Sequence, residues 1–109
     1  MAGRLALAMS YIDGKEKDNI IYFVDNENNK TSRLTANRLN SKSVLLCLDP
    51  GNRLECIVNN EYVFRLGENR LGIMPCKVKQ TYAILGFSAP QNIDILRKSL
   101  YEKIYGKKG

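Results

Sequence analysis

The stretch SVLLCLDPGNRLECIV at residues 43–58 decides the fold class that this sequence predicts. Two apolar runs, Val44–Leu48 and Leu54–Val58, flank the segment DPGN at 49–52. Branched apolar residues favour extended backbone, whereas proline, glycine, aspartate and asparagine favour tight turns. The stretch therefore predicts two antiparallel β-strands joined by a turn.

The alternation of apolar and polar residues extends over the first 87 residues. Turn-forming pairs such as Asp13-Gly14 and Asn59-Asn60 divide it, and asparagine tolerates the positive φ that tight hairpins need. Short strands at this spacing predict an antiparallel barrel or sandwich, and 109 residues provide one core. The further expected strands are Leu5–Ile12, Ile20–Val24, Ser32–Leu39, Tyr62–Leu66, Ile73–Lys79 and Tyr82–Phe87.

The apolar period changes after residue 87 to the spacing of a helix. The segment SAPQ at 88–91 has the composition of a helix start with an early proline, and Gly106 is a plausible stop. We therefore expect one C-terminal α-helix at about 89–105, with Leu96 and Leu100 buried against the β-structure. The apolar stripe consists of Ile93, Leu96, Leu100 and Ile104.

The composition also indicates in which cellular compartment we expect the protein. Apolar residues make up 44% and charged residues 26%, which is ordinary for a globular domain. The longest apolar run, Leu5–Met9, is far shorter than the ~20 residues of a membrane helix. It is also too short for the apolar part of a secretion signal. We therefore expect no membrane insertion, and the default compartment is the cytosol.

No catalytic or metal-binding pattern stands out. The chain has no histidine, and its cysteines Cys47, Cys56 and Cys76 lack a CxxC spacing. We expect buried free thiols, no metal site and no cofactor. Paired acids and nucleophile motifs are also missing, so we expect no catalytic residue and interpret the chain as a binding protein rather than an enzyme.

Positive charge is concentrated in two stretches. The net charge is +6, and residues 28–48 and 69–93 contain bases but no aspartate or glutamate. Such stretches suit a phosphate backbone, because each neutralised phosphate releases condensed counterions. For any single base, a solvated exterior is the simpler interpretation. The candidate phosphate ligands are Arg33, Arg38, Lys42, Arg70, Lys77 and Lys79.

An aromatic side chain beside such bases can stack on a nucleobase, which contributes ~1–3 kcal/mol per base. Tyr62 is the candidate, because a tyrosine hydroxyl tolerates water. Core packing is the alternative for every aromatic residue, and we favour it for Phe64 and Phe87.

Four segments resemble one protein family in the same order along the chain. LAMS at 7–10 resembles its first strand, and the stretch at 43–58 resembles its central hairpin. RLGIMPCKV at 70–78 resembles a strand with a Pro-Cys-basic-apolar sequence, and YAILGF at 82–87 resembles the last strand before the terminal helix. The family is non-structural protein 9 of coronaviruses and related nidoviruses, and the resemblance covers most of the chain.

The resemblance implies a single domain over residues 1–109, mainly β, with a small open antiparallel β-barrel of six to seven strands and one C-terminal α-helix. It implies a non-catalytic protein that binds single-stranded RNA in the viral replication and transcription complex of the host cytoplasm, with the viral polymerase complex as partner. Family members also form a homodimer through a GxxxG motif in that helix.

This sequence departs from the family at the dimer motif. Asp94 and Lys98 occupy the positions that best match the two helix glycines. The chain is then either monomeric, with these two charges paired on the outer face of the helix, or a dimer with its helices farther apart. The second arrangement, which we slightly favour, buries Ile93 and Ile95 and keeps Asp94 and Lys98 at the rim.

Two other classes remain open. A pleckstrin-homology-like sandwich also combines about seven strands with a terminal helix, and it binds peptides or phosphoinositides. An OB-fold subunit of a telomere or replication complex combines strands and a helix and works mainly as an assembly partner. Strand order separates the first class from the others, and salt-dependent RNA binding separates both from the leading hypothesis.

Overall fold

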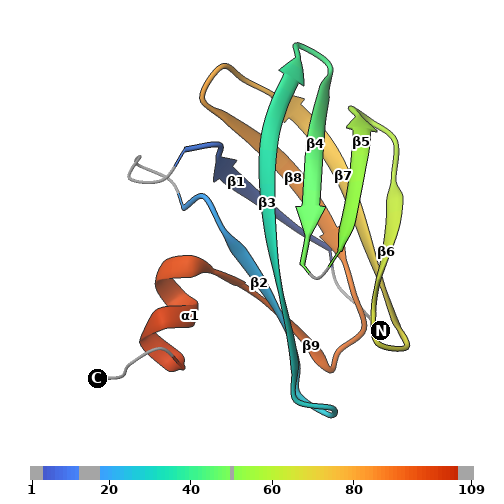
Figure 1. Cartoon of the computed structure of the whole chain (residues 1–109), viewed down its shortest axis with the longest axis vertical. Helices are drawn as coiled ribbons and strands as arrows, with labels where there is room; N and C mark the ends of the chain where they lie inside the picture. The colour runs from blue at the N-terminus through green and yellow to red at the C-terminus, as the bar shows by residue number, and fades with distance from the viewer. Residues whose placement is uncertain (1–3, 13–17, 50, 106–109) are drawn as a thin grey trace.

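The computed structural model describes residues 4–12, 18–49 and 51–105. These residues form a mainly β structure with one C-terminal helix, as expected (Figure 1). All eight expected strands are present, Tyr62–Leu66 with the expected ends and the others with shifted ends, and a ninth follows them. The elements are β1 (Arg4–Ser10), β2 (Ile21–Asp25), β3 (Lys30–Asn40), β4 (Ser43–Leu48), β5 (Asn52–Ile57), β6 (Tyr62–Leu66), β7 (Asn69–Val78), β8 (Tyr82–Ser88), β9 (Ile93–Arg97) and α1 (Lys98–Ile104).

The strands form two open antiparallel sheets. One sheet has the order β1-β8-β7-β6 and the other the order β5-β4-β3-β2-β9. The sheets pack face to face, with β3, β4 and β5 in front of β7 and β8 in Figure 1. Neither sheet closes on itself or on the other through a strand ladder in the described part of the chain, so the expected barrel is not confirmed.

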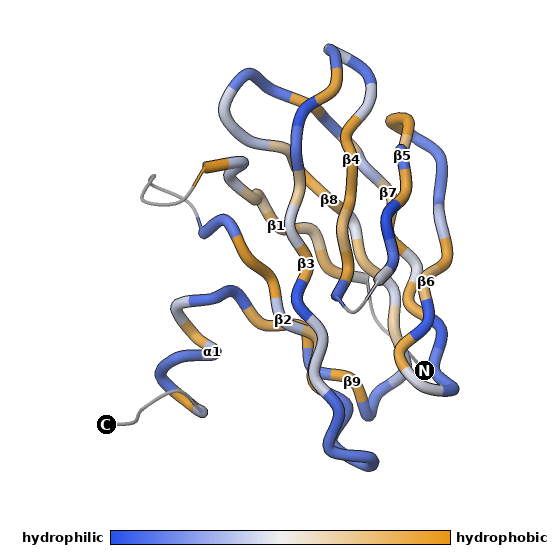
Figure 2. Tube along the Cα trace, in the orientation of Figure 1, coloured by the Kyte–Doolittle hydropathy of each residue, from blue (hydrophilic) through white to orange (hydrophobic). Residues whose placement is uncertain are grey.

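Turn residues act where the sequence predicts them. Gly51 has a φ of 82° and Asn59 has a φ of 67°, values that glycine and asparagine adopt at low cost. The turn at Asp13-Gly14, Pro50 and the stop at Gly106 lie outside the described residues. The hydropathy pattern in Figure 2 agrees with this division into strands and turns. The connection between β2 and β3 is hydrophilic, while apolar residues lie along the strands.

The core lies between the two sheets and comes from the alternating inward positions of the strands. Phe23 of β2 and Phe87 of β8 meet edge to face across it, with ring centroids 5.7 Å apart. The fully buried apolar side chains are Met9, Ile21, Phe23, Leu34, Val44, Leu46, Cys56, Leu71, Ile73, Ala83 and Leu85.

The helix is shorter than the sequence predicts. Residues 93–97 form strand β9, which pairs with β2 in the register Phe23↔Ile95, and α1 has only seven residues. Ile93 and Leu96 fit a helical stripe, but Ile93 and Ile95 also have the alternation of a strand, and pairing with β2 satisfies the backbone hydrogen bonds on one edge of that strand. The prediction of a buried Leu100 is wrong, since this side chain is 45% exposed, and Leu96 is half-buried.

One aromatic contact holds the helix to its sheet. The rings of Tyr22 on β2 and Tyr101 on α1 stack with centroids 3.8 Å apart and an interplanar angle of 12°. Tyr105 adds a tilted ring 5.1 Å from Tyr101. No described residue of α1 is buried, so the helix lies on the surface and does not plug the core.

The buried carboxylate of Asp25 organises three connections at one end of the molecule. It accepts hydrogen bonds from the side-chain amides of Asn28, Asn69 and Asn92, which precede β3, begin β7 and precede β9. The backbone N–H groups of Glu27 and Asn28 donate to it as well. These donors hold the pKa of Asp25 below its ordinary value, chiefly through Asn28, while burial opposes them.

Candidate nucleic-acid interface

Four exposed basic residues lie at the end of the molecule opposite the Asp25 connections. Figure 1 shows the β3–β4 and β7–β8 connections together at this end. Arg38 lies near the end of β3 and Lys42 in the turn that follows; Lys77 lies near the end of β7 and Lys79 just after it. We call this group the basic end: Arg38, Lys42, Lys77 and Lys79.

Backbone hydrogen bonds hold these connections together. The N–H of Val58 donates to the carbonyl of Lys42 at 2.9 Å, and the N–H of Asn59 donates to the carbonyl of Pro75 at 2.8 Å. The β5–β6 connection thereby ties the Lys42 turn in one sheet to β7 in the other. The backbone segments that hold the basic residues are therefore fixed relative to one another.

Tyr11 joins the same end from β1. Its hydroxyl lies 2.8 Å from the carbonyl oxygen of Lys79 and 2.9 Å from that of Tyr82, and it donates to them. Burial raises the pKa of Tyr11, and the positive charge of Arg38 opposes that rise.

The other two predicted phosphate ligands lie elsewhere. Arg33 is exposed in the middle of the five-stranded sheet and forms an ion pair with Asp49, with a nitrogen–oxygen distance of 3.3 Å. Arg70 lies at the hairpin between β6 and β7, directly opposite Arg65. The structure thus groups four of the six predicted bases and leaves two apart.

Tyr62 lies near the Lys42 turn, because its hydroxyl contacts Ile57 and the next residue, Val58, donates to the carbonyl of Lys42, but its ring is half-buried. It packs partly against the core, and its hydroxyl accepts a hydrogen bond of 3.0 Å from the N–H of Ile57. The aromatic residue tied directly to the basic end is Tyr82, whose carbonyl accepts a hydrogen bond of 2.8 Å from the N–H of Lys79. Sequence reasoning did not single out Tyr82, which lies three residues from Lys79 across the β7–β8 turn. It could not find Tyr11 at this place, because only the pairing of β1 with β8 brings that residue to Lys79.

The residues predicted for a helical dimer interface are not on one helix. Ile93, Asp94 and Ile95 belong to β9, and only Lys98 belongs to α1. The carboxylate of Asp94 accepts a hydrogen bond of 2.8 Å from the side-chain amide of Asn26. Asp94 and Lys98 therefore do not lie one turn apart on a single helix, which corrects the expected placement of the interface residues, while a dimer through them stays a prediction.

The thiols have no partner thiol or metal cluster among the described residues. Cys47, Cys56 and Cys76 are free, but only Cys56 is fully buried, and burial raises its pKa to about 11. No group of three histidine, cysteine or acidic residues gathers within residues 4–12, 18–49 and 51–105. In the same ranges no helix is long and apolar enough to cross a membrane.

Comparison with known proteins identifies no relative that could guide the interpretation of this site. The chain matches no family model, no curated protein and no solved structure. The basic end must therefore be interpreted from its own residues. Its features are four exposed cations, two ordered sheets beneath them and a half-buried tyrosine at Lys79.

Proposed function

We propose that this protein binds single-stranded RNA through the basic end, without catalysing a reaction. The observation that carries the proposal is the grouping of Arg38, Lys42, Lys77 and Lys79, all exposed, from two different sheets. One acid lies beside this group, because Glu55 on β5 lines the same pocket as Lys42. The four cations outnumber it, and an excess of positive charge makes a surface that attracts phosphates.

Each of the four cations neutralises one phosphate. Contacts to phosphates carry no sequence information, so we expect binding that tolerates many sequences. The resemblance to the nidovirus family supports a place beside the viral polymerase complex in the host cytoplasm. In that interpretation the two open sheets correspond to the halves of the family's open barrel.

The test is a titration of fluorescently labelled oligouridine at several salt concentrations. Four phosphate contacts to a single strand give a slope of about −3 in a plot of log affinity against log salt, so a doubling of salt lowers affinity about sevenfold. The double variant Arg38→Ala/Lys79→Ala should reduce this slope to about −1.4. If RNA fails to bind at low salt, or binds with no salt dependence, the proposal is wrong.

A matched control removes the same charge elsewhere. Arg53 and Arg65 are exposed and lie on β5 and β6, away from the basic end. Arg53→Ala/Arg65→Ala lowers the net charge by the same two units, so it separates a local site from a general attraction between a basic protein and RNA. The control should leave the slope near −3.

A further inference from the structure

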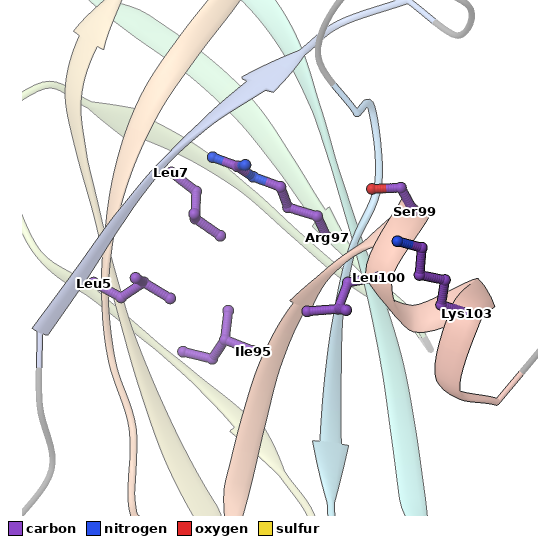
Figure 3. Close-up of a pocket in the computed structure, with 7 residues that line it drawn as sticks. All are labelled: Leu5, Leu7, Ile95, Arg97, Ser99, Leu100 and Lys103. Atoms are coloured by element: carbon purple, nitrogen blue, oxygen red, sulfur yellow. The ribbon is translucent and has the colours of Figure 1, made fainter.

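A groove separates the edge strands of the two sheets. It has a volume of about 440 Å³ and is lined by Leu5, Leu7, Ile95, Arg97, Ser99, Leu100 and Lys103. Figure 3 shows leucines of β1 on one side and Ile95 and Leu100 on the other, with their side chains directed into the gap. Leu5 is 40% and Leu100 45% exposed, so the apolar floor is open to solvent.

Both strands that border the groove have a free edge. β1 pairs only with β8, and β9 pairs only with β2, among the strands that the structure describes. Backbone groups in an antiparallel strand point alternately to one neighbour and the other. Because the N–H of Tyr11 donates to Thr81, beside β8, and that of Ser10 donates to Asp18, the N–H and C=O groups of Ala6 and Ala8 point away from β8.

The same reasoning applies to β9. The N–H of Lys98 donates to Ile20, just before β2, so the backbone groups of Ile95 and Arg97 point away from β2. Helix α1 follows β9 directly and lines the groove on that side. The edge of β1 at Ala6 and Ala8 is therefore the more open of the two. An open strand edge beside an apolar floor is the arrangement to which extended peptides add as a strand.

The rim of the groove is positively charged. Arg97 and Lys103 are both exposed, and the Arg33–Asp49 ion pair involves neither. We propose that the groove binds an extended peptide segment of another protein, which adds antiparallel to β1, places apolar side chains over Leu5, Leu7, Ile95 and Leu100, and sets acidic side chains against Arg97 and Lys103. This site is separate from the basic end and does not depend on RNA binding.

Other occupants fit less well. A second copy of this chain, with its net charge of +6, would bring a second set of bases to the same rim. A fatty acid would satisfy the apolar floor and the charges, but such an open groove covers only one side of it, whereas small-ligand sites bury most of the ligand surface. A peptide gains main-chain hydrogen bonds from the edge as well.

The direction of β1 makes the proposal specific. In Figure 3 β1 and β9 both run toward the end of the groove where Arg97 and α1 lie. An antiparallel peptide therefore begins at that end, and its acidic residues belong at its amino end. The probe is a fluorescein-labelled peptide of about eight residues in which valine alternates with threonine after two initial glutamates. Its partner probe carries the two glutamates at the carboxyl end.

Fluorescence polarisation should show that the first peptide binds at least about fivefold more tightly than the second. Leu100→Asp, at a surface position, should weaken binding about tenfold or more. Arg97→Glu/Lys103→Glu should reverse the preference in favour of a peptide with lysines in place of the glutamates. Equal binding of both orientations, or tighter binding of decanoate than of either peptide, would overturn the proposal.

Amide hydrogen exchange tests the edge directly. The amides of Ala6 and Ala8 should exchange quickly in the free protein and slowly with the peptide bound. Ala6→Pro removes an N–H that makes no bond to β8, so it should abolish peptide binding while the melting curve remains cooperative. Protection only at Ile95 and Arg97 would contradict the assignment to β1. A dimer that Ala6→Pro dissociates in light scattering would show a second copy instead of a peptide.

Discussion

The carboxylate of Asp18 accepts two hydrogen bonds from Ser99, one from its hydroxyl at 2.8 Å and one from its backbone N–H at 3.3 Å. The backbone carbonyl of the same aspartate accepts the N–H of Ser10 at 2.9 Å. Asp18, which lies three residues before β2, therefore joins the end of β1 to the first turn of α1. The seven-residue helix would be marginal alone, and this contact and the Tyr22–Tyr101 stack stabilise it.

Removal of the Asp18 carboxylate should loosen the helix. Asp18→Ala takes away an acceptor that acts like a helix cap, so we expect a loss of about 0.5–2 kcal/mol in the free energy of unfolding. Urea denaturation followed by far-ultraviolet circular dichroism measures it. Asp18→Asn keeps one acceptor oxygen and should lose less. Equal stability of Asp18→Ala and wild type would show that Ser99 does not need this contact.

Asp25 should make the stability of the folded protein depend on pH in the acidic range. Hydrogen bonds from Asn28, Asn92 and the backbone depress the pKa of Asp25 below its ordinary 3.8, against the effect of burial. A depressed pKa stabilises the folded state fully above that ordinary value, and the stabilisation disappears as the pH falls through the folded pKa. Thermal melting should show Asp25→Asn well below wild type at pH 7, with a smaller gap at the lowest pH that permits folding. A gap that does not change with pH would contradict this role.

Leu100 should tolerate truncation, because it is 45% exposed. We expect Leu100→Ala to cost less than about 1 kcal/mol, within the range of surface substitutions. Leu85→Ala is the matched comparison, since Leu85 is fully buried and such changes cost ~2–5 kcal/mol. Equilibrium denaturation of both variants gives the answer. Similar losses would mean that Leu100 is covered in solution.

Cys56 should be the least reactive thiol of the folded protein. Burial raises its pKa to about 11, so almost no thiolate exists at pH 8, and the side chain has no solvent-exposed surface. A thiol-specific reagent should label Cys47 and Cys76, which are partly exposed, before Cys56. Cys56→Ala should leave the number of rapidly labelled thiols unchanged. Rapid labelling of three thiols without denaturant would be inconsistent with this burial.

The sequence determined the strands and their turns, because both depend on local chemistry. A continuous apolar run marks β4 and alternating apolar residues mark β6, while Gly51 and Asn59, which tolerate positive φ, mark turns. The same local information led to an error after Pro90. The spacing of Ile93, Leu96 and Leu100 suits a helix, yet Ile93 and Ile95 also alternate, and only the free edge of β2 selects the strand.

The tertiary structure alone decided the two surfaces for which we propose binding of RNA and of a peptide. Arg38 lies on β3 and Lys79 just after β7 of the other sheet, 41 positions further along, and the pairing of β1 with β8 that brings Tyr11 to Lys79 carries no local signal. The peptide groove likewise joins Leu7 to Ile95, near opposite ends of the sequence. Apolar alternation says that a side chain faces the core, but it cannot say which two edges remain unpaired. That depends on the order of strands in the sheets, which long-range hydrogen bonding and packing select.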